Sequence, residues 1–391
     1  MAAFVPVVSG QHSALAASVF CSSLAGLLLQ PLLASIPTRL PGVADEARAA
    51  LYVRVGAGVL IALFGLLVLA GSLKVITEGI EWTAALRVGT WRFVDVVIGT
   101  LAMLVGQGLY ALVAAWYTRQ SDMGGVAFLR TAYGCCAVAF SGAAVLLGDG
   151  FYPVILSSSG ALLVATLGTF IWRHRGARAP LFREAVRSFT QYGVIWRSGW
   201  RLSVAGAANG FTAQAAGLAV PALGAFSEAW AIILRTGGGF TTVMQTVVAP
   251  FVERDLGLAV RVADDRAFRR TVVKGWGAGL AAGALAAAVG TLAVLWSTAP
   301  SSPTTVWLGL AALLYFLGQT GTGAISRALA IADRQSSQLA WDLARFLVFL
   351  TIIARLSGVE LLTAVGGTVF VFSVIFVLLA LKRPPGRLRR T

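Results

Sequence analysis

The feature that most constrains this chain is a succession of apolar runs, each long enough to cross a lipid bilayer. A membrane-spanning helix needs about 20 consecutive, mostly apolar residues. By that measure eleven segments of the sequence are candidates, and short basic segments separate most of them. Charged residues make up 12% of the chain, whereas a soluble domain carries about 25%. The sequence therefore predicts an all-α integral membrane protein with about 11 transmembrane helices.

The predicted helices divide into five before and six after the longest polar interruption. They cover residues 13–36, 55–73, 94–116, 131–147, 151–172, 202–223, 228–251, 275–296, 304–330, 336–356 and 359–381. We therefore expect four parts: an N-terminal helical half (1–172), a basic linker (173–201), a C-terminal half of six helices (202–381) and a basic tail (382–391).

The linker holds seven arginines between its two flanking apolar runs. Within it, apolar residues recur at roughly helical spacing, namely Leu181, Phe182, Ala185, Phe189 and Tyr192. Such a pattern is typical of a short helix that lies in the headgroup layer of an anionic leaflet. Two interpretations stay open: a hinge that couples two halves of a transporter, or an ordinary basic cytoplasmic loop.

The basic residues also indicate how the chain is oriented. Loops that carry most of the lysines and arginines alternate with loops that carry few or none, and the linker and the tail belong to the basic set. Because basic loops stay on the cytoplasmic side, we expect a multi-pass protein of the cytoplasmic membrane with its C-terminus in the cytoplasm. Topology thus accounts for the net charge of +15, and no nucleic-acid partner is expected.

An internal repeat relates the two halves. Residues 43–46 (VADE) resemble residues 262–265 (VADD) at an offset of 219 residues, since 262 − 43 = 219. The same offset places Pro31 on Pro250 and Gly56 on Gly275. Two parallel repeats around a central cavity are the expected arrangement. Shifting the helix at 202–223 back by 219 lands before or on the first residue. The first half therefore has five helices, and the first helix of its repeat is expected to be missing.

One stretch carries a characteristic order of features. Residues 218–270 read LAVPALGAFSEAWAIILRTGGGFTTVMQTVVAPFVERDLGLAVRVADDRAFRR. A glycine-rich segment precedes an alanine-rich helix with an internal arginine (Arg235). A proline (Pro250) and then an acidic–basic loop (253–270) follow. This order resembles that of the polysaccharide (Wzx-type) flippases of the multidrug/oligosaccharidyl-lipid/polysaccharide exporter (MOP) superfamily, in which the proline ends the helix. The resemblance implies two six-helix halves, a basic cytoplasmic linker and transport of a lipid-linked glycan.

Arg235 is the first candidate for substrate binding, because ionisable groups inside apolar spans are costly and are functional candidates by default. Three glycines follow it at 237–239, where they would let a neighbouring backbone or a ligand approach closely. A guanidinium that faces a wet cavity could hold a pyrophosphate or an acidic sugar through paired hydrogen bonds. The alternative is an arginine that snorkels outward or caps a neighbouring helix.

Asp342 and Arg345 form the second candidate. They lie three residues apart in the tenth predicted helix and therefore share a face. If the pair is functional, Arg345 would bind the substrate anion and Asp342 would respond to a coupling proton or cation. The alternative is a self-neutralising pair that makes two buried charges tolerable. Arg92 and Asp95 repeat this spacing at the outer end of the third helix, where an interfacial cap is the expected role.

Several amides could line a polar route for sugar hydroxyls, although interhelical hydrogen bonding explains such residues equally well. They are Gln107, Asn209, Gln214, Gln245 and Gln319, of which Asn209, Gln214 and Gln319 are the ones we assign to substrate binding. In many of the similar flippases an acidic–basic pair occupies the helix that here carries Asn209 and Gln214. The three cysteines lie in apolar runs and the chain has two histidines. We therefore expect no metal site, no cofactor and no catalytic residue.

These observations favour a flippase that moves a lipid-linked oligosaccharide or polysaccharide precursor across the cytoplasmic membrane by alternating access. Its partners would be a polyprenyl-linked glycan, membrane lipids and glycan assembly enzymes. A cation-coupled multidrug exporter of the MATE type is the alternative, although such an exporter should favour buried carboxylates and Asp342 is the single deep one. A non-transporting relic is a further alternative because of the missing helix. An enzyme is not expected, since the outer loops are short and offer few acidic or histidine residues.

Overall fold

A computed structural model describes residues 12–33, 36, 46–78, 87–88, 91–120, 122–146, 151–173, 191–262, 264–297, 302–332 and 334–382 of the chain. These residues form two compact units, of which the first ends at Pro221 and the second begins at Ala222. The helix at 202–218 packs in the first unit, whereas the division made from the sequence places it with the C-terminal half.

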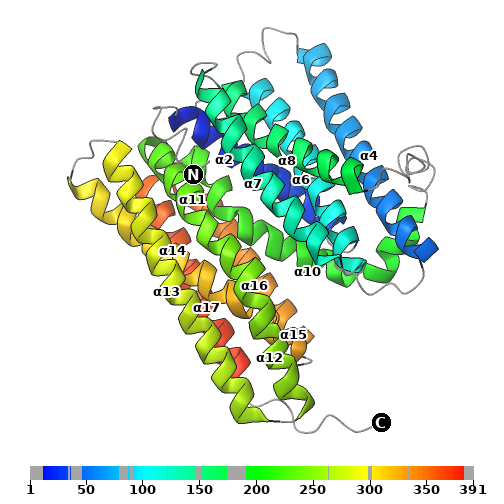
Figure 1. The fold of residues 1–391 in the computed structure, drawn as a ribbon. Helices are drawn as coiled ribbons and strands as arrows, with labels where there is room; N and C mark the ends of the chain where they lie inside the picture. The colour runs from blue at the N-terminus through cyan, green and yellow to red at the C-terminus, as the bar shows by residue number, and fades with distance from the viewer. Residues whose placement is uncertain are drawn as a thin grey trace. The chain divides into compact units, whose positions relative to one another are not determined.

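In the described part of the chain, the first unit contains six long helices (Figure 1). They are α2 (His12–Leu33), α4 (Glu46–Glu78), α6 (Phe93–Arg119), α7 (Met123–Leu146), α8 (Phe151–Arg173) and α10 (Tyr192–Leu218). Two very short strands, β1 (Arg87–Val88) and β2 (Trp91–Arg92), pair antiparallel just before α6. This strand pair was not predicted from the sequence, because strands of two residues carry no readable hydrophobic period.

The second unit follows a tight turn, η3 (Val220–Phe226), that contains the boundary. Its elements are α11 (Ser227–Val243), the π-helical turn η4 (Met244–Val248), α12 (Ala249–Arg261), α13 (Asp265–Ser297), α14 (Ser302–Ile325), α15 (Ala328–Ile331), α16 (Gln335–Arg355) and α17 (Gly358–Leu381). Pro250 lies in the first turn of α12, where proline is tolerated. The expectation that Pro250 ends the helix is therefore wrong, because helical structure resumes and continues to Arg261.

The prediction of an all-helical membrane protein is confirmed. Ten segments of the described residues are long and apolar enough to cross a membrane. One of them, Val204–Val243, contains the C-terminal part of α10 and all of α11, which were predicted from the sequence as two crossings. Regular helical geometry breaks between the two helices at Gly224, whose φ of 56° and ψ of −122° favour glycine.

The structure gives a physical reason for the repeated VAD[DE] motif. Helices α4 and α13 both have 33 residues, and both ends differ by the same offset, since 265 − 46 = 219 and 297 − 78 = 219. Asp264 precedes α13, and its Oδ1 accepts hydrogen bonds from the backbone N–H groups of Arg266 (3.0 Å) and Ala267 (2.9 Å). The motif is therefore a helix start that recurs in the second repeat. The equivalent Asp45 lies outside the described residues.

Replacing Asp264 by alanine is expected to destabilise the protein by about 1 kcal/mol, because the substitution leaves two N-terminal N–H groups of α13 without their acceptor. Asp264→Asn is the matched control, since asparagine keeps the acceptor oxygen and ranks with aspartate as an N-cap. Thermal unfolding of the purified protein in detergent measures both variants. Equal stability of the alanine and asparagine variants would contradict the capping role.

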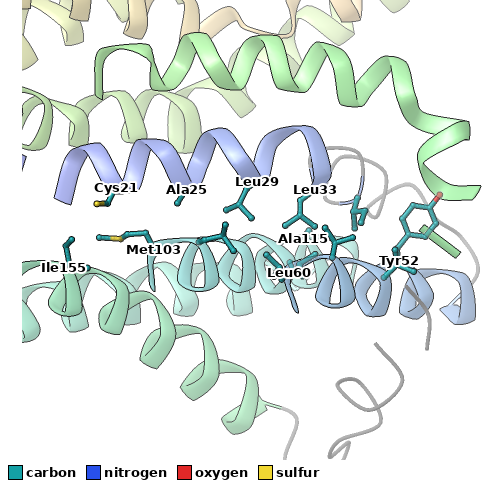
Figure 2. Packing of buried hydrophobic residues seen from close by; sticks show 14 of the residues in the cluster. Cys21, Ala25, Leu29, Leu33, Tyr52, Leu60, Met103, Ala115 and Ile155 are labelled. Atoms are coloured by element: carbon teal, nitrogen blue, oxygen red, sulfur yellow. The ribbon is translucent and has the colours of Figure 1, made fainter. Parts of the chain in front are cut away.

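Helix α2 is the centre of the first unit. Its residues Cys21, Ala25, Leu29 and Leu33 face buried side chains from the neighbouring helices (Figure 2). Those side chains include Tyr52 and Leu60 of α4, Met103 and Ala115 of α6, and Ile155 of α8. On another side α2 packs closely against α10 through small residues. A Cβ at Gly26 would meet Gln214, one at Gly210 would meet Gln30, and one at Gly217 would meet Ser23.

Glycines also set the packing of the second unit, in which α14 packs extensively against both α13 and α17. A Cβ at Gly279 of α13 would lie 2.6 Å from the backbone of Gly321. A Cβ at Gly318 of α14 would lie 2.5 Å from the backbone of Val369 on α17. Backbones that approach this closely tolerate no side chain, so small residues define how these three helices fit together.

Candidate functional site

The second unit holds two buried charges on α16. Asp342 is 3% exposed and Arg345 is 7% exposed. Their spacing of three residues puts both side chains on one face of the helix, where the carboxylate and the guanidinium interact electrostatically. Burial of a charge costs free energy unless an opposite charge or a polar group compensates for the lost hydration. The sequence analysis selected both residues for this reason, and their functional roles stay predictions.

An aromatic side chain supports Arg345 from one turn earlier on α16. The Arg345 guanidinium carbon lies 4.3 Å from the centroid of the Trp341 ring, within the range of a cation–π interaction. Trp341 itself is held in place by α17, because its indole N–H donates a 2.9 Å hydrogen bond to the carbonyl of Phe372. The ring of Phe376 lies 4.9 Å from that of Trp341 and completes the support.

Two further aromatic residues extend this arrangement to other helices. Tyr315 of α14 is 7% exposed and interacts electrostatically with Arg345. Its ring packs edge to face on Trp230 of α11, with 5.6 Å between the centroids. We call Trp230, Tyr315, Trp341, Asp342 and Arg345 the charged aromatic cluster. A guanidinium group can bind an anion through paired hydrogen bonds, and flanking aromatic rings can exclude water from that contact.

The sequence analysis did not identify the three aromatic members of this cluster. Trp341 could have been found, since it precedes Arg345 by four residues and so lies on the same helical face. Trp230 and Tyr315 could not, because nothing in a single sequence indicates which faces of α11, α14 and α16 meet. Gln319, a predicted substrate-binding residue, lies one turn from Tyr315 on α14 and is half-buried.

Arg235 occupies a different place. It is half-buried on α11, and the groups that act electrostatically on Arg345 are Asp342 and Tyr315. Helices α11 and α16 do not pack extensively against each other in the described part of the chain. The two predicted anion-binding arginines therefore lie on different helices. Gly237, which follows Arg235, packs against the ring of Phe316.

The remaining predicted polar residues lie in varied surroundings. Asn209 is exposed, and Gln214 is half-buried against Gly26 of α2. Gln107 of α6 donates a 2.8 Å hydrogen bond to the hydroxyl of Ser22 on α2, which is the interhelical role that the sequence analysis left open. Gln245 is exposed on the π-helical turn.

Two other expectations concern residues at helix ends. Asp95, in the first turn of α6, accepts a 2.6 Å hydrogen bond from the hydroxyl of Tyr152 on α8. Of the apolar residues that define the expected linker helix, Tyr192 begins α10, and the others lie outside the described residues.

Among the residues that the structure describes, no three histidine, cysteine or acidic side chains gather closely enough to hold a metal ion.

Comparison with known proteins reveals similarity of fold. No protein-family model matches the chain, and no curated protein matches its sequence. Solved structures do match. The first is an inward-facing multidrug resistance MATE family transporter of the MOP superfamily, with a TM-score of 0.56, 12% identity and coverage of 97% of this chain and 92% of that one.

Two other structures match less well over a similar length. A MOP superfamily transporter from Pyrococcus furiosus has a TM-score of 0.48, 13% identity and coverage of 97% and 90%. A MATE protein in complex with Br-NRF has a TM-score of 0.37, 14% identity and coverage of 97% and 85%. The first match extends over nearly the whole of both chains. This multi-pass membrane protein therefore has the fold of the MOP superfamily transporters.

Proposed function

We propose that this chain is a membrane transporter that flips a lipid-linked oligosaccharide or polysaccharide precursor across the cytoplasmic membrane by alternating access. The observation that carries the proposal is the buried Arg345, which lies beside Asp342 and on the ring of Trp341. The MOP superfamily fold supports the transport part of the proposal. The buried guanidinium supports the choice of an anionic substrate, because a fixed cation in a dry site compensates for the hydration that an anion loses.

In this mechanism Arg345 binds the pyrophosphate or an acidic sugar of the substrate through paired hydrogen bonds. Asp342 competes with that anion for the guanidinium and takes up the coupling proton or cation when the substrate displaces it. Arg235 is proposed as a second, separate contact for substrate anions, and Asn209, Gln214 and Gln319 as contacts for sugar hydroxyls. A polyprenyl-linked glycan and glycan assembly enzymes are the proposed partners, with the C-terminus in the cytoplasm.

A second candidate function is cation-coupled export of drugs. The observation that favours it is the similarity of fold to a multidrug resistance MATE family transporter. In that case the buried carboxylate of Asp342 would bind the cation that is exported or coupled, and Arg345 would serve to neutralise the carboxylate. The two functions therefore assign opposite roles to the same pair of residues.

Substitution of Arg345 by alanine is expected to lower the rate of glycan transport by about tenfold to a hundredfold, because hydrogen bonds to a charged group are worth about 1.5–3 kcal/mol. Leaflet translocation in proteoliposomes measures this effect with a fluorescent polyprenyl-pyrophosphate glycan and an external quencher. Arg235→Ala tests the second arginine in the same assay. Arg355→Ala is the matched control, since Arg355 is exposed at the end of the same helix.

Four outcomes separate the functions. Loss of transport in Arg345→Ala but not in Arg355→Ala supports the anion-binding flippase. Normal transport by both Arg345→Ala and Arg235→Ala would overturn the assignment of these arginines. Export of a cationic dye that requires Asp342, without glycan transport, would favour the drug exporter. Folded wild-type protein that moves neither substrate would point to a non-transporting relic.

A further inference from the structure

The surface of interest lies at the start of α13, where four basic side chains are exposed. They are Arg266, Arg269, Arg270 and Lys274. Arg266, Arg270 and Lys274 follow one another at intervals of four residues and so line one face of the helix, with Arg269 beside them. We call these four residues the basic surface of α13. In the described part of the chain, none of the four makes an ion pair.

The acidic residues nearby are already engaged with other groups. Glu253 pairs with Arg327 at 3.2 Å, and Asp255 pairs with Arg254 at 3.0 Å. Asp264 caps the N-terminus of α13, and Asp265 lies in the first turn, where the helix dipole favours a negative charge. Four neighbouring cations thus outnumber the two aspartates beside them, Asp264 and Asp265, so the surface carries a net positive charge. Such a concentration of positive charge favours the binding of an external anion.

The length of α13 places this surface at a membrane boundary. Its 33 residues extend for about 50 Å at about 1.5 Å per residue. The hydrocarbon core of a bilayer takes only about 20 residues. Residues 275–297 contain no charged side chain, so they supply the membrane-crossing part. The basic surface occupies the turns that remain, directly where the hydrocarbon ends and the lipid headgroups begin.

Large apolar side chains are exposed beside the cations. Val273 of α13 is 50% exposed, and Phe251, Leu258 and Val262 in and just after the adjacent α12 are 60%, 47% and 71% exposed. Helices α12 and α13 pack against each other within the second unit. A surface that combines exposed apolar groups with unpaired cations suits the boundary between acyl chains and headgroups. It does not suit bulk water, in which the apolar groups would be unfavourable.

The internal repeat shows that these four positions are not basic in both halves of the chain. At the offset of 219 residues, the four cations correspond to Ala47, Ala50, Leu51 and Val55 in α4. The two helices have equal length, and yet the first carries apolar residues at all four positions. The first repeat does carry two arginines in this segment, Arg48 and Arg54, but at other positions, so the row of cations at these four positions belongs to the second repeat.

We propose that the basic surface of α13 binds the phosphate headgroup of an anionic phospholipid, with the lipid's acyl chains against the exposed apolar residues of α12 and α13. The lipid thereby anchors the second unit to an anionic leaflet. This inference does not depend on the transported substrate, because the four cations are exposed, whereas Asp342 and Arg345 of α16 are buried.

The test is a lipid titration of the delipidated full-length protein, with bound lipids counted by native mass spectrometry. Phosphatidylglycerol is the anionic probe and phosphatidylcholine the neutral one. A cation near an anionic lipid surface contributes about fivefold to affinity. Arg266→Gln/Arg270→Gln is therefore expected to weaken phosphatidylglycerol binding by roughly tenfold or more and to leave phosphatidylcholine binding unchanged. Lys274→Gln alone is expected to weaken phosphatidylglycerol binding by about fivefold. This single variant provides the test if the double variant does not fold.

The matched control is Arg92→Gln/Arg355→Gln, which removes two exposed charges elsewhere and should bind phosphatidylglycerol as the wild type does. Wild-type affinity in Arg266→Gln/Arg270→Gln would overturn the proposal, and so would an equal loss of both lipids. Displacement of phosphatidylglycerol by inorganic phosphate, but not by chloride at equal ionic strength, would show a site for free phosphate instead of a lipid site.

Discussion

Replacing Asp342 by leucine is expected to destabilise the protein by about 3–5 kcal/mol, because Arg345 would then keep its buried charge without the carboxylate beside it. Arg345→Met is expected to cost less. An aspartate that loses its partner can take up a proton and become neutral, whereas a guanidinium stays charged at every accessible pH. Thermal unfolding in detergent, with both variants measured at the same pH, determines the order of the two effects.

The double variant Asp342→Leu/Arg345→Met separates stability from function. A buried ion pair that is replaced by apolar residues of similar volume often leaves stability unchanged or raises it. The double variant should therefore unfold near the wild-type temperature, although each single variant unfolds earlier. If it folds well and transports nothing, the pair serves transport. If it folds well and transports at the wild-type rate, the pair only neutralises itself, and the proposed anion site is wrong.

The helices could be predicted from the sequence because long apolar runs report directly where a chain can cross hydrocarbon. Their ends could not. The predicted starts at 55 and 275 lie about nine or ten residues inside α4 and α13, which begin at Glu46 and Asp265. Hydropathy marks where the hydrocarbon ends, whereas backbone hydrogen bonds continue the helix into the headgroup layer. The repeated aspartate was visible in the sequence, but the capping role of Asp264 was not.

The candidate site could be predicted only in part, for a related reason. Asp342 and Arg345 could be selected from the cost of burying charge within an apolar run. Their aromatic neighbours Trp230 and Tyr315 come from α11 and α14, more than 25 residues away along the chain. Such contacts depend on how helices pack, and a single sequence gives no measure of that.

The other large expected effect on stability concerns two glycines of α13, which are only two residues apart. A Cβ at Gly279 would lie 2.6 Å from the carbonyl oxygen of Thr320 and from the Cα of Gly321, both of which are backbone atoms of α14. A Cβ at Gly277 would meet nothing within 4 Å. The first position is closed to any side chain, and the second is open.

Gly279→Leu is therefore expected to destabilise the protein by about 3 kcal/mol or more, because α13 and α14 must separate to admit the side chain. Gly277→Leu is the matched control and should be neutral or stabilising by about 0.5–1 kcal/mol, since leucine has the higher helix propensity. Thermal unfolding of the two variants in the same detergent compares them directly. Opposite signs for the same substitution on one helix would confirm that the contact between α13 and α14, and not helix propensity, sets the stability there. Equal effects would contradict this packing.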